Sequence, residues 1–489
     1  MEDYKKKIKL NALSGYLNLF LNSFIILLIS PLLVKFLGNV DFGIWKSIQK
    51  ILSITSVADG RSTQALKSFI SNLEGDNDVN KKKRLIGSAL KVSFFFMPLT
   101  VIIIAGVIYF LPTFINDIPA DYISIVRITG FVLALNIILT PILSIPDSIL
   151  VGTNNIYKLT NIQTLTTLLM NAMFVLFSYL GYGILGLGIV STFILLLNGV
   201  LIYFICKKTI PWFGIKKPDK KDISVFFKFS FWVFIWMFVE RLMLSTEIFL
   251  IGYLLSPIDI TIYSFSSYVV QLVLPIALLT SSAFVPTIGK FIGNNDFVNV
   301  INITKKLKNS LKIISIIFGV SIVLFNHLFI KIWVGEFYYL GDFNNFLMVI
   351  IMVQLLLFRS DSQIQDQTLK IKNKVIIGLI GTVFVFVLAI LIFKLRNELS
   401  SIFLSIIFGR ILITIFFRIY LNSFLNVKKV DFKDELLIFS VICLTYLLSY
   451  LFHNNLALNL LIFSIVILSV YKFCDGKTII KTIINKNKL

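Results

Sequence analysis

Charged residues interrupt several long apolar segments of this sequence. A carboxylate or guanidinium near the middle of a bilayer costs roughly 2.5–3.5 kcal/mol on insertion scales, so such groups are expected to pair, to face a wet cavity, or both. Arginine suits phosphate because its guanidinium forms bidentate, charge-assisted hydrogen bonds. The candidate phosphate-binding residues are Arg61, Arg241, Arg359 and Arg410. The candidates for binding a coupling proton or sodium ion are Asp59, Glu240, Glu247 and Asp361.

Six of these residues also have a neighbour of opposite charge close by in the sequence, which allows a purely structural interpretation as local ion pairs. The pairs would be Asp59 with Arg61, Glu240 with Arg241, and Arg359 with Asp361. Adjacent residues of a helix point in different directions, whereas residues seven positions apart, such as Glu240 and Glu247, share a face. We therefore expect the partners of these charges to lie on other helices.

The composition is that of a membrane protein. The chain has 489 residues, of which 57% are hydrophobic, and its mean hydropathy is +0.90. The net charge of +21 comes mostly from lysines and arginines in short loops, which is the bias of cytoplasmic loops rather than evidence for nucleic-acid binding. The three cysteines have neither the spacing of metal ligands nor that of a disulfide framework. We expect an all-α polytopic membrane protein.

The apolar blocks predict about fourteen transmembrane helices. Their limits are 10–36, 42–70, 88–111, 121–150, 156–180, 184–206, 223–252, 261–289, 311–333, 343–369, 375–394, 399–425, 434–452 and 455–473. Basic loops alternate with short acidic loops, which places both termini in the cytoplasm. Arg127 and Arg418 lie near the ends of their spans, where we expect them to act as interfacial anchors.

A weak internal repeat runs through the chain. The turn at 37–45 matches the turn at 255–263, an offset of 218 positions (255 − 37). The same offset brings the loop at 75–78 onto the loop at 293–296. Because each copy would hold six helices, an even number, both copies should insert the same way round, related by an axis along the membrane normal.

The repeat predicts two six-helix lobes with a central cavity. The N-lobe would comprise residues 1–208, the cytoplasmic linker 209–222, and the C-lobe 223–427. Two additional helices and a cytoplasmic tail would occupy 428–489. The offset sends none of the four candidate arginines onto another arginine, which favours a specialised site over a duplicated scaffold role.

Two motifs resemble a known family. The first is Leu37-Gly-x-x-Asp-Phe-Gly-Ile-Trp45, and the second is Asp59-Gly-Arg-Ser-Thr-Gln-Ala-Leu66, which runs into an acidic and then basic loop. Together with helix number, topology and duplication, they resemble the polysaccharide exporter branch of the multidrug/oligosaccharidyl-lipid/polysaccharide (MOP) flippase superfamily. Arg61 departs from the small or apolar residue expected at its position, so the resemblance assigns it no role.

The resemblance implies a flippase of the bacterial cytoplasmic membrane. It would move undecaprenyl-pyrophosphate-linked oligosaccharide, such as an O-antigen or capsule unit, to the outer leaflet by alternating access. The candidate arginines would then line a cationic cavity for the pyrophosphate. Implied partners are this lipid-linked glycan, membrane lipid and polysaccharide polymerase or assembly proteins, with no nucleic acid. No cofactor is expected beyond a possible coupling ion, H⁺ or Na⁺.

Two other functions compete with this one. A drug or organic-cation antiporter of the same superfamily would need a site for cations, which arginines in the lumen oppose. A membrane-embedded glycan polymerase, ligase or acyltransferase would need an acid/base cluster or a nucleophile with its base. The predicted outer loops are short, and the two histidines lie in different spans. We therefore expect a transporter rather than an enzyme.

Overall fold

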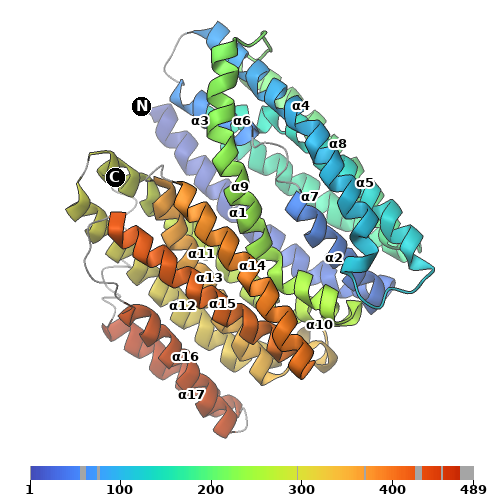
Figure 1. Ribbon diagram of the computed structural model, residues 1–489, viewed down its shortest axis with the longest axis vertical. Coiled ribbons are helices and arrows are strands. Elements are labelled where there is room, and N and C mark those ends of the chain that lie inside the picture. Colours follow the sequence, from blue (N-terminus) through green and yellow to red (C-terminus); the bar gives the residue numbers. More distant parts are fainter. Residues whose placement is uncertain are drawn as a thin grey trace. The chain divides into compact units, whose positions relative to one another are not determined.

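The computed structural model is helical throughout the part that it describes (Figure 1). The described residues are 2–55, 62–73, 78–294, 296–367, 371–424, 432–452 and 455–473. Within these ranges the chain forms helices, turns and loops but no strand. The predicted all-α fold class is confirmed.

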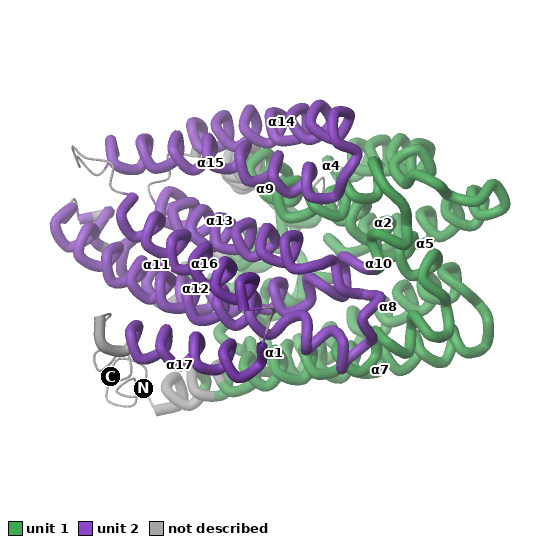
Figure 2. The backbone as a smooth tube through the Cα atoms, turned by 90° about the horizontal axis from the view of Figure 1, so that it is seen from below, with its two compact units in different colours: residues 1–261 green, residues 262–489 purple. Residues whose placement is uncertain are grey.

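The chain forms two compact units, Met1–Thr261 and Ile262–Leu489, coloured separately in Figure 2. The boundary falls inside α10 (Pro257–Ser266). The other helices of the first unit are α1 (Glu2–Leu37), α2 (Asn39–Thr55), α3 (Ser62–Asn72), α4 (Val79–Phe110), η2 (Leu111–Phe114), α5 (Tyr122–Leu143), α6 (Ile145–Gly152), α7 (Ile156–Tyr179), α8 (Gly183–Thr209) and α9 (Lys220–Leu254). The second unit contains α11 (Tyr268–Gly293), α12 (Phe297–Trp333), η3 (Glu336–Tyr338), α13 (Asp342–Gln367), α14 (Ile371–Arg396), α15 (Leu399–Phe424), α16 (Lys433–Leu451) and α17 (Leu456–Phe473).

The helices follow the offset of the sequence repeat. Helices α2 and α10 start 218 positions apart (257 − 39), and so do α4 and α12 (297 − 79). The N-terminus of α4 is capped by Asp78, whose side chain accepts a hydrogen bond from Lys81 N at 2.9 Å. Asp296 caps α12 in the same way, through Asn299 N at 3.2 Å. The repeat therefore extends to helix starts and caps.

The compact units and the predicted lobes divide the chain at different places. Helix α9, which opens the predicted C-lobe, packs in the first unit against α2, α3 and α4. The two units meet in sequence at residues 261 and 262, whereas the predicted linker is 209–222. The division into six-helix lobes stays a prediction.

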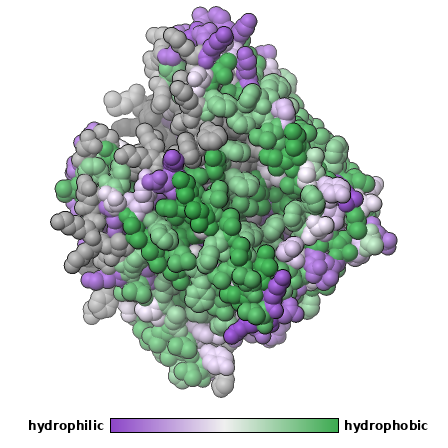
Figure 3. All heavy atoms as spheres, viewed as in Figure 1, coloured by the Kyte–Doolittle hydropathy of each residue, from purple (hydrophilic) through white to green (hydrophobic). Residues whose placement is uncertain are grey.

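Ten of the described helices are long and apolar enough to cross a membrane. The bent pair α10–α11, which turns by 55°, would make an eleventh span. The remaining three predicted spans correspond to α2 with α3, to α9 and to the shorter apolar α17, so the number fourteen stays a prediction. Large hydrophobic side chains such as Phe95, Ile102 and Leu468 are exposed on these helices, and one face of the molecule is broadly apolar (Figure 3). Exposed apolar surface of this extent suits lipid rather than water.

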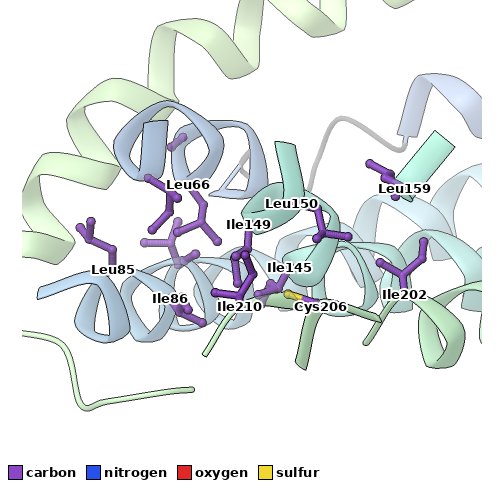
Figure 4. Packing of buried hydrophobic residues seen from close by; sticks show 14 of the residues in the cluster. Leu66, Leu85, Ile86, Ile145, Ile149, Leu150, Leu159, Ile202, Cys206 and Ile210 are labelled. Atoms are coloured by element: carbon purple, nitrogen blue, oxygen red, sulfur yellow. The ribbon is translucent and has the colours of Figure 1, made fainter. Parts of the chain in front are cut away.

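One hydrophobic cluster holds several helix ends of the first unit together (Figure 4). Ile70 of α3, Ile86 of α4 and Ile149 of α6 are fully buried in it. Gly152 lets α6 approach α3, because a Cβ there would lie 2.8 Å from the Ile70 side chain. Between membrane helices, such contacts stabilise mainly through close van der Waals packing. This packing fixes the start of α4 and the loop that follows α8.

Candidate functional site

Two lysines project from α2 one helical turn apart. Lys46 and Lys50 are both half-buried, and each lies in the electrostatic range of the other. Lys46 Nζ also lies 5.1 Å from the centre of the Phe42 ring, an aromatic face that attracts cations. The buried residues of α2 include Phe42, Ile44 and Ile48, so the two ammonium groups lie on a largely apolar helix.

Helix α9 brings three charged residues to the first unit. Glu247 is buried, with 8% of its surface exposed, whereas Glu240 and Arg241 are half-buried. Helices α2 and α9 pack together, and Lys50 is attracted by Glu247 and repelled by Arg241. The structure therefore brings the predicted residues Arg241 and Glu247 to one lysine. We call Lys46, Lys50, Arg241 and Glu247 the α2–α9 charge cluster.

The α2–α9 charge cluster contains three cations and one carboxylate. Glu247 compensates part of the positive charge, because a buried cation is stabilised by an opposite charge in a medium of low dielectric constant. Glu240, next to Arg241 on α9, adds a second carboxylate close to these three cations. Lysine binds phosphate as a point charge and arginine binds it through a planar fork, so the cluster offers both kinds of contact.

A second set of charges is buried in the second unit. Asp361 of α13 and Arg418 of α15 are only 1% and 3% exposed. Arg418 Nε donates a hydrogen bond to Asp361 Oδ2 at 2.8 Å, and Arg418 Nη2 donates one to Glu435 Oε1 of α16 at 2.5 Å. Lys308 Nζ of α12 lies 3.5 Å from Asp361 Oδ1. These four residues form the α12–α16 charge network.

Comparison with known proteins identifies the family. A family model described as "Polysaccharide biosynthesis protein" matches residues 32–341, which is well over half of the chain. The chain belongs to this polysaccharide biosynthesis protein family. The matched region contains both copies of the repeated turn and the whole α2–α9 charge cluster. No curated protein sequence matches the chain significantly.

Solved structures show the fold that this family member adopts. An inward closed lipid II flippase MurJ is 14% identical, with a TM-score of 0.68 over 96% of this chain and 99% of that one. An inward-facing multidrug resistance MATE family transporter of the MOP superfamily is 13% identical, with a TM-score of 0.64 over 83% and 94%. A MOP superfamily transporter from Pyrococcus furiosus is 13% identical, with a TM-score of 0.58 over 86% and 95%. The chain is thus a multi-pass membrane protein with the MOP fold, as its motifs predict.

The predicted site residues of this polysaccharide biosynthesis protein lie in different places. Arg241 and Glu247 belong to the α2–α9 charge cluster, with Glu240 adjacent on α9. Asp361 belongs to the α12–α16 charge network, and Arg359 is half-buried two positions before it. Arg410 is buried on α15. Asp59 and Arg61 lie outside the described residues.

The interpretation of Arg418 as an interfacial anchor is wrong. Its guanidinium is buried and is held between the carboxylates of Asp361 and Glu435, which compensate its loss of hydration. Asp361 and Arg418 are 57 positions apart and lie on different helices. The position of Arg418 near the end of a span therefore did not predict its burial, because burial depends on the neighbouring helices.

Three lysines of the two charged groups were not predicted from the sequence: Lys46, Lys50 and Lys308. The candidate site residues were charges near the middle of spans. Lys46 and Lys50 lie near the start of the predicted span 42–70. Their signal is the spacing of four, which places both on one face of an apolar helix. Lys308 belongs to a basic stretch in a predicted loop, where nothing distinguishes it from Lys305 or Lys306.

Proposed function

We propose that this protein flips undecaprenyl-pyrophosphate-linked oligosaccharide from the cytoplasmic to the outer leaflet of the bacterial cytoplasmic membrane, with both termini in the cytoplasm. Membership of the polysaccharide biosynthesis family and the MOP fold support a carrier of lipid-linked glycan. The observation that carries the proposal is the packing of α9, with Arg241 and Glu247, against α2, with Lys50. A pyrophosphate needs such cations to enter a medium of low dielectric constant.

In this proposal the α2–α9 charge cluster holds and releases the pyrophosphate. In the empty state Glu247 compensates Lys50, so the cationic site persists without a ligand. An arriving pyrophosphate competes with Glu247 for Lys50 and gains Arg241 as a second partner. Protonation or sodium binding at the freed carboxylate would favour the loaded state. Alternating access would then expose the same groups to the other leaflet.

The other candidate residues have places in the same proposal. Arg61 stays a candidate for the pyrophosphate from the sequence, and Arg359 and Arg410 would serve the second unit. Asp59, Glu240 and Asp361 stay candidates for the coupling ion. Since Asp361 is already held by Arg418 and Lys308, a coupling ion there would have to compete with two cations.

The proposal is tested by flipping of a fluorescent undecaprenyl-pyrophosphate-oligosaccharide in proteoliposomes. We compare the wild type with Lys50→Met, Arg241→Ala and Arg61→Ala. Loss of one charge-assisted contact should slow flipping about tenfold or more. Arg396→Met, which removes an exposed arginine at the end of α14, should flip at the wild-type rate and controls for net charge.

The possible outcomes separate the competing functions. Slow flipping by Lys50→Met and Arg241→Ala, with intact folding, would support the cationic route. Normal flipping in both variants would reject the α2–α9 charge cluster as the pyrophosphate site. A wild type that does not flip the lipid but takes up an organic cation would be a drug antiporter. A wild type that elongates or transfers the glycan would be an enzyme.

A further inference from the structure

A polar pocket of about 240 Å³ lies within the first unit. It is formed where α3 ends, where α4 begins, and where the chain leaves α6 and α8. Its lining residues are Lys7, Ile70, Lys82, Thr153, Asn155, Thr209, Ile210 and Trp212. The surrounding basic loops place this end of the helices on the predicted cytoplasmic side. None of these residues belongs to the α2–α9 charge cluster.

Lys82 is the unusual residue of the pocket. Only 6% of its surface is exposed, although lysine is almost never fully buried without a partner. Its Nζ atom lies 5.4 Å from the centre of the Trp212 ring, which also lines the pocket. In the described part of the chain, Lys82 makes no ion pair with a carboxylate. A ring face compensates an ammonium only partly.

The remaining polar groups around the pocket suit an anion. Lys7 provides a second ammonium group, and none of the eight lining residues is acidic. Thr209 Oγ1 accepts a hydrogen bond from Lys158 Nζ at 3.0 Å, which brings a third cation to the rim and leaves the hydroxyl proton available to a ligand. The Thr153 hydroxyl already donates to Ile149 O at 2.8 Å, so the pocket combines positive charge with one hydroxyl donor, Thr209.

The position of Lys82 is fixed by the fold around it. Lys82 lies near the start of α4, where its main-chain N–H donates a hydrogen bond to Asp78 O at 3.2 Å. Ile86, one turn further along α4, is fully buried in the hydrophobic cluster shown in Figure 4. Ile70 and Ile210 join that cluster and line the pocket. The ammonium group is thus held at the pocket by a packed core.

We propose that this pocket binds a phosphate group, supplied by the headgroup of an anionic membrane lipid or by a free phosphate ion. Its volume is below the 300–1,000 Å³ typical of sites for drug-sized ligands, so it fits a headgroup or a small anion better than a glycan. The phosphate neutralises Lys82 and accepts hydrogen bonds from Thr209. This binding does not depend on the transport of a lipid-linked glycan.

The test uses the purified full-length chain and two probes. Binding of inorganic phosphate is measured by the shift of the thermal unfolding midpoint, against sodium chloride at equal ionic strength to remove general screening. Retention of phosphatidylglycerol, against phosphatidylcholine, is measured by native mass spectrometry. The main variant is Lys82→Met, which keeps an unbranched side chain in the pocket. Its control is Lys91→Met, which removes an exposed lysine of the same helix.

We expect Lys82→Met to weaken binding of at least one probe about tenfold, and Lys91→Met to leave it unchanged. An effect on phosphatidylglycerol alone identifies a lipid headgroup, and an effect on inorganic phosphate alone identifies a soluble anion. If Lys82→Met binds each of the two probes as tightly as Lys91→Met does, the proposal is overturned. If Lys82→Met does not fold, Thr209→Val decides the matter, because it removes a proposed hydroxyl donor and leaves every charge in place.

Discussion

Thr261 Oγ1 donates a hydrogen bond to the main-chain carbonyl oxygen of Asn39 at 2.6 Å. Asn39 opens α2, and Thr261 lies one turn into α10, whose start is 218 positions later. Beside this bond, Gly43 faces the carbonyl oxygen of Pro257. Asn39 and Pro257 are equivalent positions of the repeat, and so are Gly43 and Thr261. The two copies of the repeated turn therefore pack directly on each other.

Gly43→Ala should destabilise this contact. A Cβ at position 43 would lie 1.9 Å from Pro257 O, so α2 and α10 would have to separate. Overpacking of this kind costs typically 1–3 kcal/mol. The measurement is the thermal unfolding midpoint in detergent. Gly15→Ala is the matched control, since its added methyl group meets no atom within 4 Å. Equal midpoints for the two variants would contradict the close approach of α2 and α10.

Arg418→Met should destabilise the second unit strongly. It leaves the carboxylates of Asp361 and Glu435 without their shared guanidinium, and breaking a buried ion pair costs about 3–5 kcal/mol. The double variant with Asp361→Asn should lose less than the sum of the two single changes, because it also removes one stranded charge. Chemical unfolding of all three variants gives the interaction free energy between Arg418 and Asp361. The control Arg396→Met, at an exposed site, should hardly change stability. If the two single variants' losses of stability simply add up in the double variant, the α12–α16 charge network does not couple them.

Removing the helix caps at Asp78 and Asp296 should have similar effects. Each side chain accepts a hydrogen bond from the main chain three residues later, and replacing such a cap by alanine costs about 1 kcal/mol. Asp121 precedes α5 but makes no capping bond with its side chain, so Asp121→Ala should change little. Hydrogen exchange at the first turns of α4, α12 and α5 measures the three effects separately. Equal protection loss at all three helices would contradict this account.

The loop at Glu336 should lose stability in acid. A hydrogen bond from Lys331 at 3.0 Å, and then one involving His327, holds the pKa of Glu336 below its usual value of 4.5. A carboxylate with a lowered pKa stabilises the fold above its usual pKa, and this contribution disappears as the pH falls through the lowered value. Because the Glu336 side chain is 61% exposed, the effect is small.

Glu336→Gln should therefore differ from the wild type at neutral pH but not well below pH 4.5. The measurement is hydrogen exchange in η3 and its neighbours as a function of pH. Lys331→Met provides the complementary change, because it removes the main cause of the lowered pKa. A difference between Glu336→Gln and the wild type that persists unchanged in acid would mean that the ion pairs play no part.

The order of helices, the membrane class and the repeat were all evident in the amino-acid sequence. These features depend on local properties. Apolar length sets which segments can span a bilayer, and short turns and caps such as those at Gly38, Asp78 and Asp296 set where helices begin. Such features can be recognised from the sequence because they are set by residues that are close together in the chain. That is why one offset of 218 positions matched both the turns and the helix starts.

The partners of the charges were decided only by the tertiary structure. Lys50 lies in the electrostatic range of Glu247 and Arg241 because α9 packs on α2. Arg418 is buried because α13 and α16 bring carboxylates to it. Lys82 Nζ lies 5.4 Å from the centre of the Trp212 ring, and both residues line a pocket formed by segments far apart in the chain. The sequence shows which side chains carry charge and on which helices they lie, but burial and pairing depend on contacts between residues far apart in the chain.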